Sequence, residues 1–164
     1  MSDWFVTNAT REPWRHTPGW GRYTVFEREG ARFPELGINV HVLDPGDVSA
    51  MYHGEDAQED FLVLGGECLL IIEGQERRLR RWDFVHCSRW VRHAFVGAGD
   101  GPCAILMVGA RRGQEDVDVL YAAEPAAARH GAAVDADTHS PAEAYVSRPR
   151  FAVGPYVPGS LPGG

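Results

Sequence analysis

Two histidines and two glutamates near the middle of the chain are the residues whose types and spacing could do chemistry. His53 and Glu55 are two residues apart, so on a β-strand both side chains would point to the same face. Glu59 follows four residues later at the start of another predicted strand, and a chain reversal between the two glutamates would bring three ligand-type groups together. His93 begins a later predicted strand, from which a second inward-facing imidazole would complete a pocket.

The segments that must position these residues are short and strand-like. Gly65-Gly66 predicts a tight hairpin between two apolar runs, and Glu73-Gly74 predicts a second tight reversal. Strands at this spacing indicate an all-β barrel or sandwich rather than alternating strands and helices. The runs that predict strands are residues 22–26, 37–43, 51–53, 60–64, 68–72, 76–79, 84–87, 93–96 and 103–108.

The two ends of the chain differ from its centre, which predicts three regions. Residues 1–36 carry Trp4, Trp14 and Trp20 among polar residues and are expected to form an arm packed on the barrel or on a partner. Residues 37–112 form the barrel core. Residues 113–164 form a C-terminal extension with short helices and a Pro/Gly-rich tail, extended or mobile from residue 148. The helices are expected at 124–130 and 140–146, the second with Ser140 as N-cap and a proline at its first position.

The central region resembles the cupin superfamily. The first cupin motif is G-x5-H-x-H-x3,4-E-x6-G, and this chain offers His53-x-Glu55-x3-Glu59-x6-Gly66. The second motif, G-x5-P-x-G-x2-H-x3-N, is matched by the segment RWDFVHCSRWVRH, which ends in His93. The chain departs from the pattern at Glu55, where the family has its second histidine. It also departs at turn positions that serve the backbone: Trp82 and Trp90 stand for glycines, Ser88 for the proline and Gly97 for the asparagine.

The resemblance implies a jelly-roll barrel (a double-stranded β-helix) with a divalent metal bound between its strands. Carried over to this sequence, the ligands are His53, Glu55 in place of a histidine, Glu59 and His93. Two imidazoles and two carboxylates suit Fe, Mn, Ni, Co or Zn, and the extra carboxylate favours Mn or Fe(II). If Glu55 turns away, the other three form a 2-His-1-carboxylate face, typical of non-haem iron oxygenases.

The remaining candidate side chains are expected to have ordinary structural roles. Cys87 is expected to be a buried, inert thiol. A base formed by His86 and Asp83 is discounted because the two residues would point to opposite faces of one strand. The other histidines are expected to be packed or exposed: His16, His41, His86, His130 and His139. Four apolar residues are expected in the core or along the pocket: Phe61, Val63, Phe84 and Phe95.

Composition argues against several classes of partner. The formal net charge of -7 leaves no basic stripe for nucleic acid and does not favour binding to anionic membranes. The longest apolar run, residues 103–110, is far shorter than the roughly 20 residues of a membrane-spanning helix. No signal peptide is evident, and three cysteines without a CxxC pair indicate a reducing compartment, so a cytoplasmic location is expected.

Two functions remain open from the sequence. The first is a metal-dependent enzyme acting on a small organic substrate, with a dioxygenase-like reaction ahead of isomerisation or decarboxylation. The alternative is a non-catalytic cupin module that binds a small molecule. Since cupins commonly form dimers, we expect a homodimer in which the N-terminal arm covers an edge strand of a second copy. The fold alone cannot choose between these functions.

Overall fold

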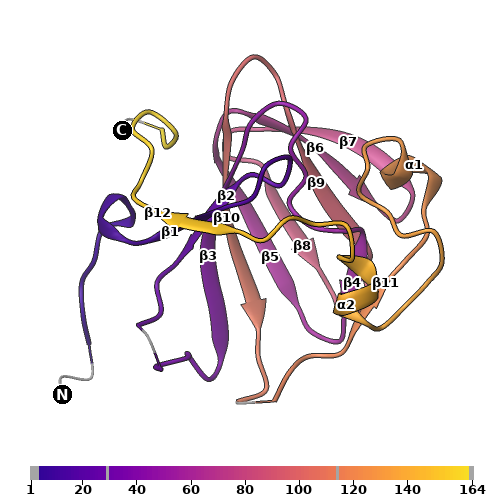
Figure 1. Ribbon diagram of the computed structural model, residues 1–164, viewed down its shortest axis with the longest axis horizontal. Coiled ribbons are helices and arrows are strands. Elements are labelled where there is room, and N and C mark those ends of the chain that lie inside the picture. Colours follow the sequence, from indigo (N-terminus) through magenta and orange to yellow (C-terminus); the bar gives the residue numbers. More distant parts are fainter. Residues whose placement is uncertain (1–3, 29, 114, 163–164) are drawn as a thin grey trace.

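Two antiparallel β-sheets packed face to face make up most of the molecule (Figure 1). The computed structural model describes residues 4–28, 30–113 and 115–162. The seven-stranded sheet has the order β12 (Ala152–Gly154), β1 (Trp14–His16), β2 (Arg22–Val25), β3 (Leu36–Leu43), β10 (Cys103–Ala110), β5 (Glu59–Gly65), β8 (Phe84–Cys87). The five-stranded sheet has the order β11 (Val119–Tyr121), β4 (His53–Glu55), β9 (His93–Ala98), β6 (Glu67–Ile72), β7 (Gln75–Arg80). The predicted all-β fold is confirmed.

The chain crosses from one sheet to the other at most connections after β3, which is the winding of a jelly roll. Alternation within the strands explains why both sheets bury one face. In β5, Phe61 and Val63 point inward, and in β8, Val85 and Cys87 do so. These side chains meet Phe95 and others between the sheets. The apolar faces of the two sheets therefore form one shared core.

Three sequence expectations are corrected by this arrangement. Phe84 does not line the core: it is 63% exposed because it alternates with the inward-facing Val85 on an edge strand. Gly65-Gly66 does not form a hairpin, since β5 and β6 lie in different sheets and this bend carries the chain between them. The strand expected at 51–53 begins at His53 instead, because Met51 and Tyr52 are buried in the preceding connection.

The tight reversal at Glu73-Gly74 is confirmed. Both residues have positive φ, 46° and 73°, and the turn joins β6 to β7 with Ile72 opposite Gln75. A two-residue loop with positive φ at both positions matches the twist of the flanking strands. The sequence signal sufficed here because the turn pairs two strands adjacent in the chain.

The two ends of the chain extend the larger sheet and cover its outer face. Strands β1 and β2 continue the sheet beyond β3, and β12 returns from the C-terminal tail to pair with β1 (Figure 1). Trp14 is buried there and packs against Tyr156, with ring centroids 5.8 Å apart and the ring planes tilted by 50°. The sequence did not predict that part of the tail forms β12 and pairs with β1. The boundaries 1–36, 37–112 and 113–164 remain a prediction.

The helices are shorter than expected. The 3-10 helix η1 spans Ala9–Arg11, and the α-helices α1 and α2 span Pro125–Ala128 and Pro141–Ala144. Ser140 caps α2 by accepting a hydrogen bond from the Glu143 backbone N–H, as its position predicts. Ala126 and Ala127 of α1 pack against Ile71 and Ala94, because small side chains allow the helix to approach the sheet closely. Within the described ranges, none of the helices is long and apolar enough to cross a membrane.

Candidate metal centre

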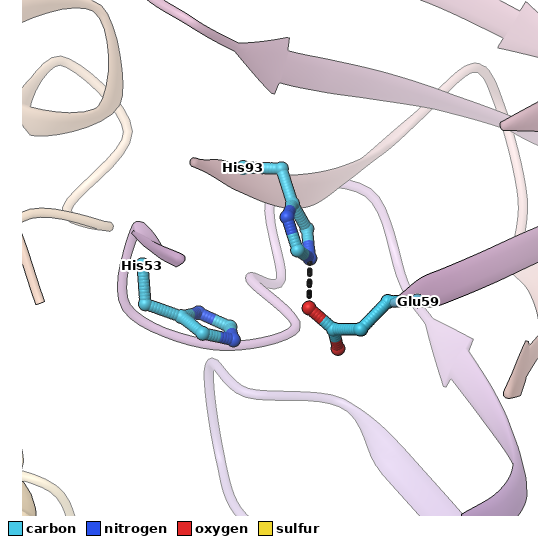
Figure 2. A group of neighbouring side chains, drawn as sticks. All are labelled: His53, Glu59 and His93. Atoms are coloured by element: carbon cyan, nitrogen blue, oxygen red, sulfur yellow. Dashed lines mark ion pairs between the residues drawn. The ribbon is translucent and has the colours of Figure 1, made fainter. Parts of the chain in front are cut away.

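Three of the four predicted ligands converge inside the mouth of the barrel. His53 of β4 and His93 of β9 are directly opposite each other in the five-stranded sheet, with ring centroids 5.1 Å apart. Glu59, the first residue of β5, reaches in from the seven-stranded sheet, and Figure 2 shows the three side chains pointing toward one another. One candidate ligand atom from each residue lies within 4.8 Å of the other two. The cluster thus joins the two sheets at one point.

The hydrogen bonds of both imidazoles determine which nitrogen faces the cluster. Nδ1 of His53 lies 2.6 Å from the carbonyl oxygen of Met51, and Nδ1 of His93 lies 3.1 Å from that of Val91. A carbonyl oxygen only accepts, so each neutral ring carries its proton on Nδ1 and donates it there. The Nε2 lone pairs are then free, and Nε2 of His93 is 3.5 Å from Oε2 of Glu59 (Figure 2). Such backbone contacts orient metal-binding histidines.

Burial and charge have opposite effects on the groups of this cluster. His93 is only 3% exposed, and burial together with the nearby charge of His53 lowers its pKa to about 3. Burial also lowers the pKa of His53, but the neighbouring Glu55 and Glu59 carboxylates outweigh it and raise that pKa. Burial and the charge of Glu55 raise the pKa of Glu59 to about 7. The protein therefore holds a neutral imidazole and a destabilised carboxylate side by side.

Glu55 lies beside the cluster, at its solvent side. Its Oε1 is 3.7 Å from Nε2 of His53, and its side chain is 26% exposed. Glu55 does not belong to the group formed by His53, Glu59 and His93, whose candidate ligand atoms lie within 4.8 Å of one another. Its role as a fourth ligand therefore remains a prediction.

Asp60 and His86 point away from the cluster. They are paired across β5 and β8, and Nδ1 of His86 lies 2.7 Å from Oδ1 of Asp60. Asp83 instead accepts a hydrogen bond from the backbone N–H of Arg80. Asp60 alternates with Glu59 along β5, so it lies on the opposite face of the sheet. In this arrangement His86 pairs with Asp60 and not with Asp83, which agrees with the expectation that His86 and Asp83 do not form a pair.

Aromatic rings and a buried thiol surround the cluster on the core side. Phe61 packs between His93 and Phe95, with ring centroids 5.0 Å and 4.8 Å away. Cys87 is opposite Glu59 in the sheet and is buried as expected. Burial and the charge of Glu59 raise the pKa of its thiol to about 12, so it is not a reactive thiolate.

Two tyrosines of the C-terminal extension complete the surroundings, and sequence reasoning did not identify them as neighbours of the cluster. Tyr121 of β11 is opposite His53, with ring centroids 5.8 Å apart. Tyr145 follows α2, packs edge-on against Tyr121, and accepts a hydrogen bond from the Met51 backbone N–H at 3.2 Å. The short apolar run at 119–121 was the only local sign of a strand there, and its partner is far away in the sequence.

A cavity of about 440 Å³ opens beside Glu55 and Glu59. This volume falls in the range of small-molecule sites. Its walls are apolar at Phe61, Met107 and Val119, and they carry charge at Arg32 and Arg111. A larger surface depression, lined by Arg15, Val25, Arg28 and others, contains none of the clustered residues. The cavity beside the cluster therefore combines candidate ligands with space for a small molecule.

The residues present fit a divalent transition metal. Two imidazole nitrogens with free lone pairs and one carboxylate face a common point, a donor set that suits Mn, Fe, Co, Ni or Zn. Donor atoms about 2.1 Å from one ion can be at most about 4.2 Å apart. The candidate ligand atoms lie within 4.8 Å of one another, so side-chain shifts of a few tenths of an ångström on each residue would bring them to binding distance of one ion.

Comparison with known proteins agrees with the architecture. A family model described as "Cupin domain" matches residues 39–109. The polyketide cyclase RemF from Streptomyces resistomycificus superposes with a TM-score of 0.59 at 15% identity, covering 70% of this chain and 83% of that protein. An RmlC-like cupin from Shewanella frigidimarina NCIMB 400 gives 0.56 at 17% identity, covering 70% and 96%.

A third structure is similar over part of its length. A candidate sugar phosphate isomerase from Acidithiobacillus ferrooxidans ATCC 23270 gives a TM-score of 0.53 at 23% identity, covering 62% of this chain. The chain spans 65% of that protein's length. At these identities the likeness shows the fold, and the chemistry must be argued from the site.

Proposed function

Because this chain belongs to the cupin superfamily, we propose that it binds one divalent transition metal through His53, Glu59 and His93 and acts on a small organic substrate. Glu55 is proposed as a fourth ligand. The observation that carries the proposal is the orientation of both imidazoles, whose Nδ1–H groups are held by backbone carbonyls while their Nε2 atoms face Glu59. That arrangement matches metal-binding histidines.

The side chains around the cluster have distinct proposed tasks. Phe61 and Phe95 close the inner side and exclude water from behind His93. Glu59 supplies negative charge, and a cation beside it would reverse the effect of burial by favouring the ionised carboxylate. When bound, the metal would supply a Lewis acid or an oxygen-binding centre. The cavity beside Glu55 would hold the substrate within reach of that centre.

The first experiment is the metal content of the protein purified without added metal or chelator. We expect about one transition metal per chain, and loss of that metal in a His53→Ala, His93→Ala double variant. A matched control is His86→Ala, which removes an outward-facing imidazole that is also paired with a carboxylate. If neither parent nor variant binds Mn²⁺ or Fe²⁺ on titration, the proposal is wrong.

The type of reaction needs a second experiment. A dioxygenase-like reaction is the version to test first, with isomerisation or decarboxylation behind it. Turnover measured with and without oxygen separates them, because only an oxygenase consumes O₂. A small molecule that binds tightly and is recovered unchanged under both conditions would instead support a non-catalytic binding module.

We also propose that the chain forms a homodimer and is cytoplasmic. The described sheets end in β12, β8, β11 and β7, and an edge strand can pair with a second copy. Trp14 is buried within its own chain, so it is not available to cover a partner. Light scattering at micromolar concentration should give twice the chain mass of 18.1 kDa, and a mass of one chain would contradict the dimer.

A further inference from the structure

Arg111 presents an unused hydrogen-bonding edge beside the proposed metal centre. One side of its guanidinium is anchored, because Nη1 donates to the Glu27 carboxylate and, at 2.9 Å, to the carbonyl oxygen of Phe33. Nε and Nη2 have no hydrogen-bond acceptor among the described residues. Among the described residues, neither nitrogen is one of the polar side-chain atoms that are buried and lack a partner. Since both lack an acceptor but are not buried, both are accessible to a ligand.

Glycines place this edge inside the barrel mouth. Gly37, Gly109 and Glu59 are side by side across β3, β10 and β5. A Cβ atom on Gly37 would lie 2.9 Å from Nη2 and 3.0 Å from Nε of Arg111, so the guanidinium lies against the bare backbone of Gly37. A Cβ on Gly109 would meet nothing nearer than Glu59, at 3.9 Å. The missing side chain at Gly37 makes room for the guanidinium, and the missing side chain at Gly109 leaves open space between Arg111 and Glu59.

The span between the two groups suits a small molecule. Gly37 and Glu59 are two strand spacings apart, about 10 Å between backbones. Both Arg111 and Glu59 line the cavity of about 440 Å³ described above. A ligand of a few carbon atoms could thus contact Arg111 at one end and the His53, Glu59 and His93 cluster at the other.

Glu27 acts as the positioning residue for this guanidinium. Burial raises the pKa of Glu27, but its hydrogen bonds with Arg111 and with the Phe33 backbone N–H outweigh burial, so the pKa lies below its ordinary value. Glu27 is therefore ionised at neutral pH and holds Nη1. A fixed guanidinium loses less entropy when its other edge binds a ligand.

We propose that Arg111 binds a carboxylate of the substrate, so that the cavity accepts small organic carboxylates. The Nε–H and Nη2–H donors form the fork that pairs with a planar carboxylate through two parallel hydrogen bonds. A dianionic phosphate fits less well at Arg111, because it places two negative charges on one group in a cavity also lined by Glu55, Glu59 and Asp116, whereas a dicarboxylate places one charge at each end. This inference rests on the proposed function only for the second end of the ligand, at the metal.

Calorimetric titration with dicarboxylates from oxalate to adipate tests the proposal, with succinamide as the uncharged analogue of succinate. The full chain is titrated both loaded with Mn²⁺ and after treatment with chelator. We expect a dicarboxylate of the series to bind and succinate to be preferred over succinamide. Arg111→Met should reduce that preference by about tenfold to a hundredfold, the loss expected for hydrogen bonds to a charged group. Arg111→Lys should restore part of it, because a lysine keeps the charge but not the fork.

Two further variants separate the position of the guanidinium from its charge. Gly37→Ala keeps the arginine and its charge but should weaken succinate binding, because the new methyl group would displace the guanidinium from its position. Arg112→Met is the matched control, since Arg112 is paired with Asp56 outside the cavity, and should bind succinate like the wild type. Thermal unfolding of each variant confirms that it is folded.

The outcomes distinguish this inference from the proposed function. If no dicarboxylate binds, if the preference for succinate survives in folded Arg111→Met, or if methyl phosphate binds more tightly than succinate, the inference is wrong. A preference that depends on Mn²⁺ but not on Arg111 would leave the metal centre standing and reject the role of Arg111. A preference that depends on Arg111 in a protein unable to bind metal would support the inference and reject the metal centre.

Discussion

Replacing His93 by alanine should abolish the stabilisation that a divalent cation gives to the fold. A ligand that binds only the folded state at a hundredfold its Kd stabilises that state by about 2.7 kcal/mol. For a chain of this size, that is a rise in Tm of roughly 5–11 °C. His93 supplies one of three converging donors, and losing even an outer-shell partner of a metal ligand costs 10–100-fold in affinity. A loss of about a hundredfold or more would leave less than about 0.5 kcal/mol, or under about 2 °C.

The assay must separate this effect from damage to the core. His93 is 3% exposed and packs against Phe61, so the alanine variant is expected to be less stable even without metal. Scanning calorimetry is therefore run on each protein with chelator and with Mn²⁺, and the difference between the two Tm values is compared. His86→Ala, which removes an exposed imidazole, should keep the full wild-type difference. A full difference in His93→Ala, or none in the wild type, would refute the reasoning.

Four further predictions follow from particular residues. Glu59→Gln should weaken Mn²⁺ binding in equilibrium dialysis more than Glu55→Gln does, since only Glu59 belongs to the closest cluster; equal losses would make Glu55 an equivalent ligand. Burial and the charge of Arg148 lower the pKa of His41 to about 4, so the free energy of unfolding should fall as the pH drops from about 6.5 toward 4. Denaturant titration of His41→Gln should show a shallower fall, and an unchanged slope would contradict this. Gly66→Ala should lower the free energy of unfolding by more than about 2 kcal/mol in denaturant titration, because φ is 74° and the new Cβ would lie 2.3 Å from the carbonyl oxygen of Pro102. The control is Gly101→Ala, at a position with open space around it, which should lower the free energy of unfolding far less. Trp14→Ala should lower the free energy of unfolding by about 3–5 kcal/mol in the same titration, because this side chain is buried. Val146→Ala, at an exposed site, should change it by less than about 0.5 kcal/mol. Similar small losses for both variants would show that the terminal strands contribute little to stability.

The sequence alone determined the features that depend on neighbouring residues. Alternation along each run indicates strands because successive side chains in a strand point to opposite faces. The same periodicity places Glu59 and Phe61 on one face of their strand and Asp60 on the other. The Glu73-Gly74 turn was predictable because a two-residue loop determines its own pairing. The motif spacing indicated His53, Glu59 and His93 as candidate metal ligands.

Only the tertiary structure decided which distant segments meet. Whether a Gly-Gly bend closes a hairpin or carries the chain to the other sheet depends on partners elsewhere, so the residues Gly65-Gly66 alone do not determine the outcome. Phe84 carries the signature of a core residue, but its strand lies at a sheet edge, where one face stays in contact with solvent. The positions of Tyr121 and Arg111 beside the cluster follow from strand pairing and from missing side chains at Gly37 and Gly109. Local residue patterns cannot report such contacts, because their free energy comes from groups that become neighbours only when the chain has folded.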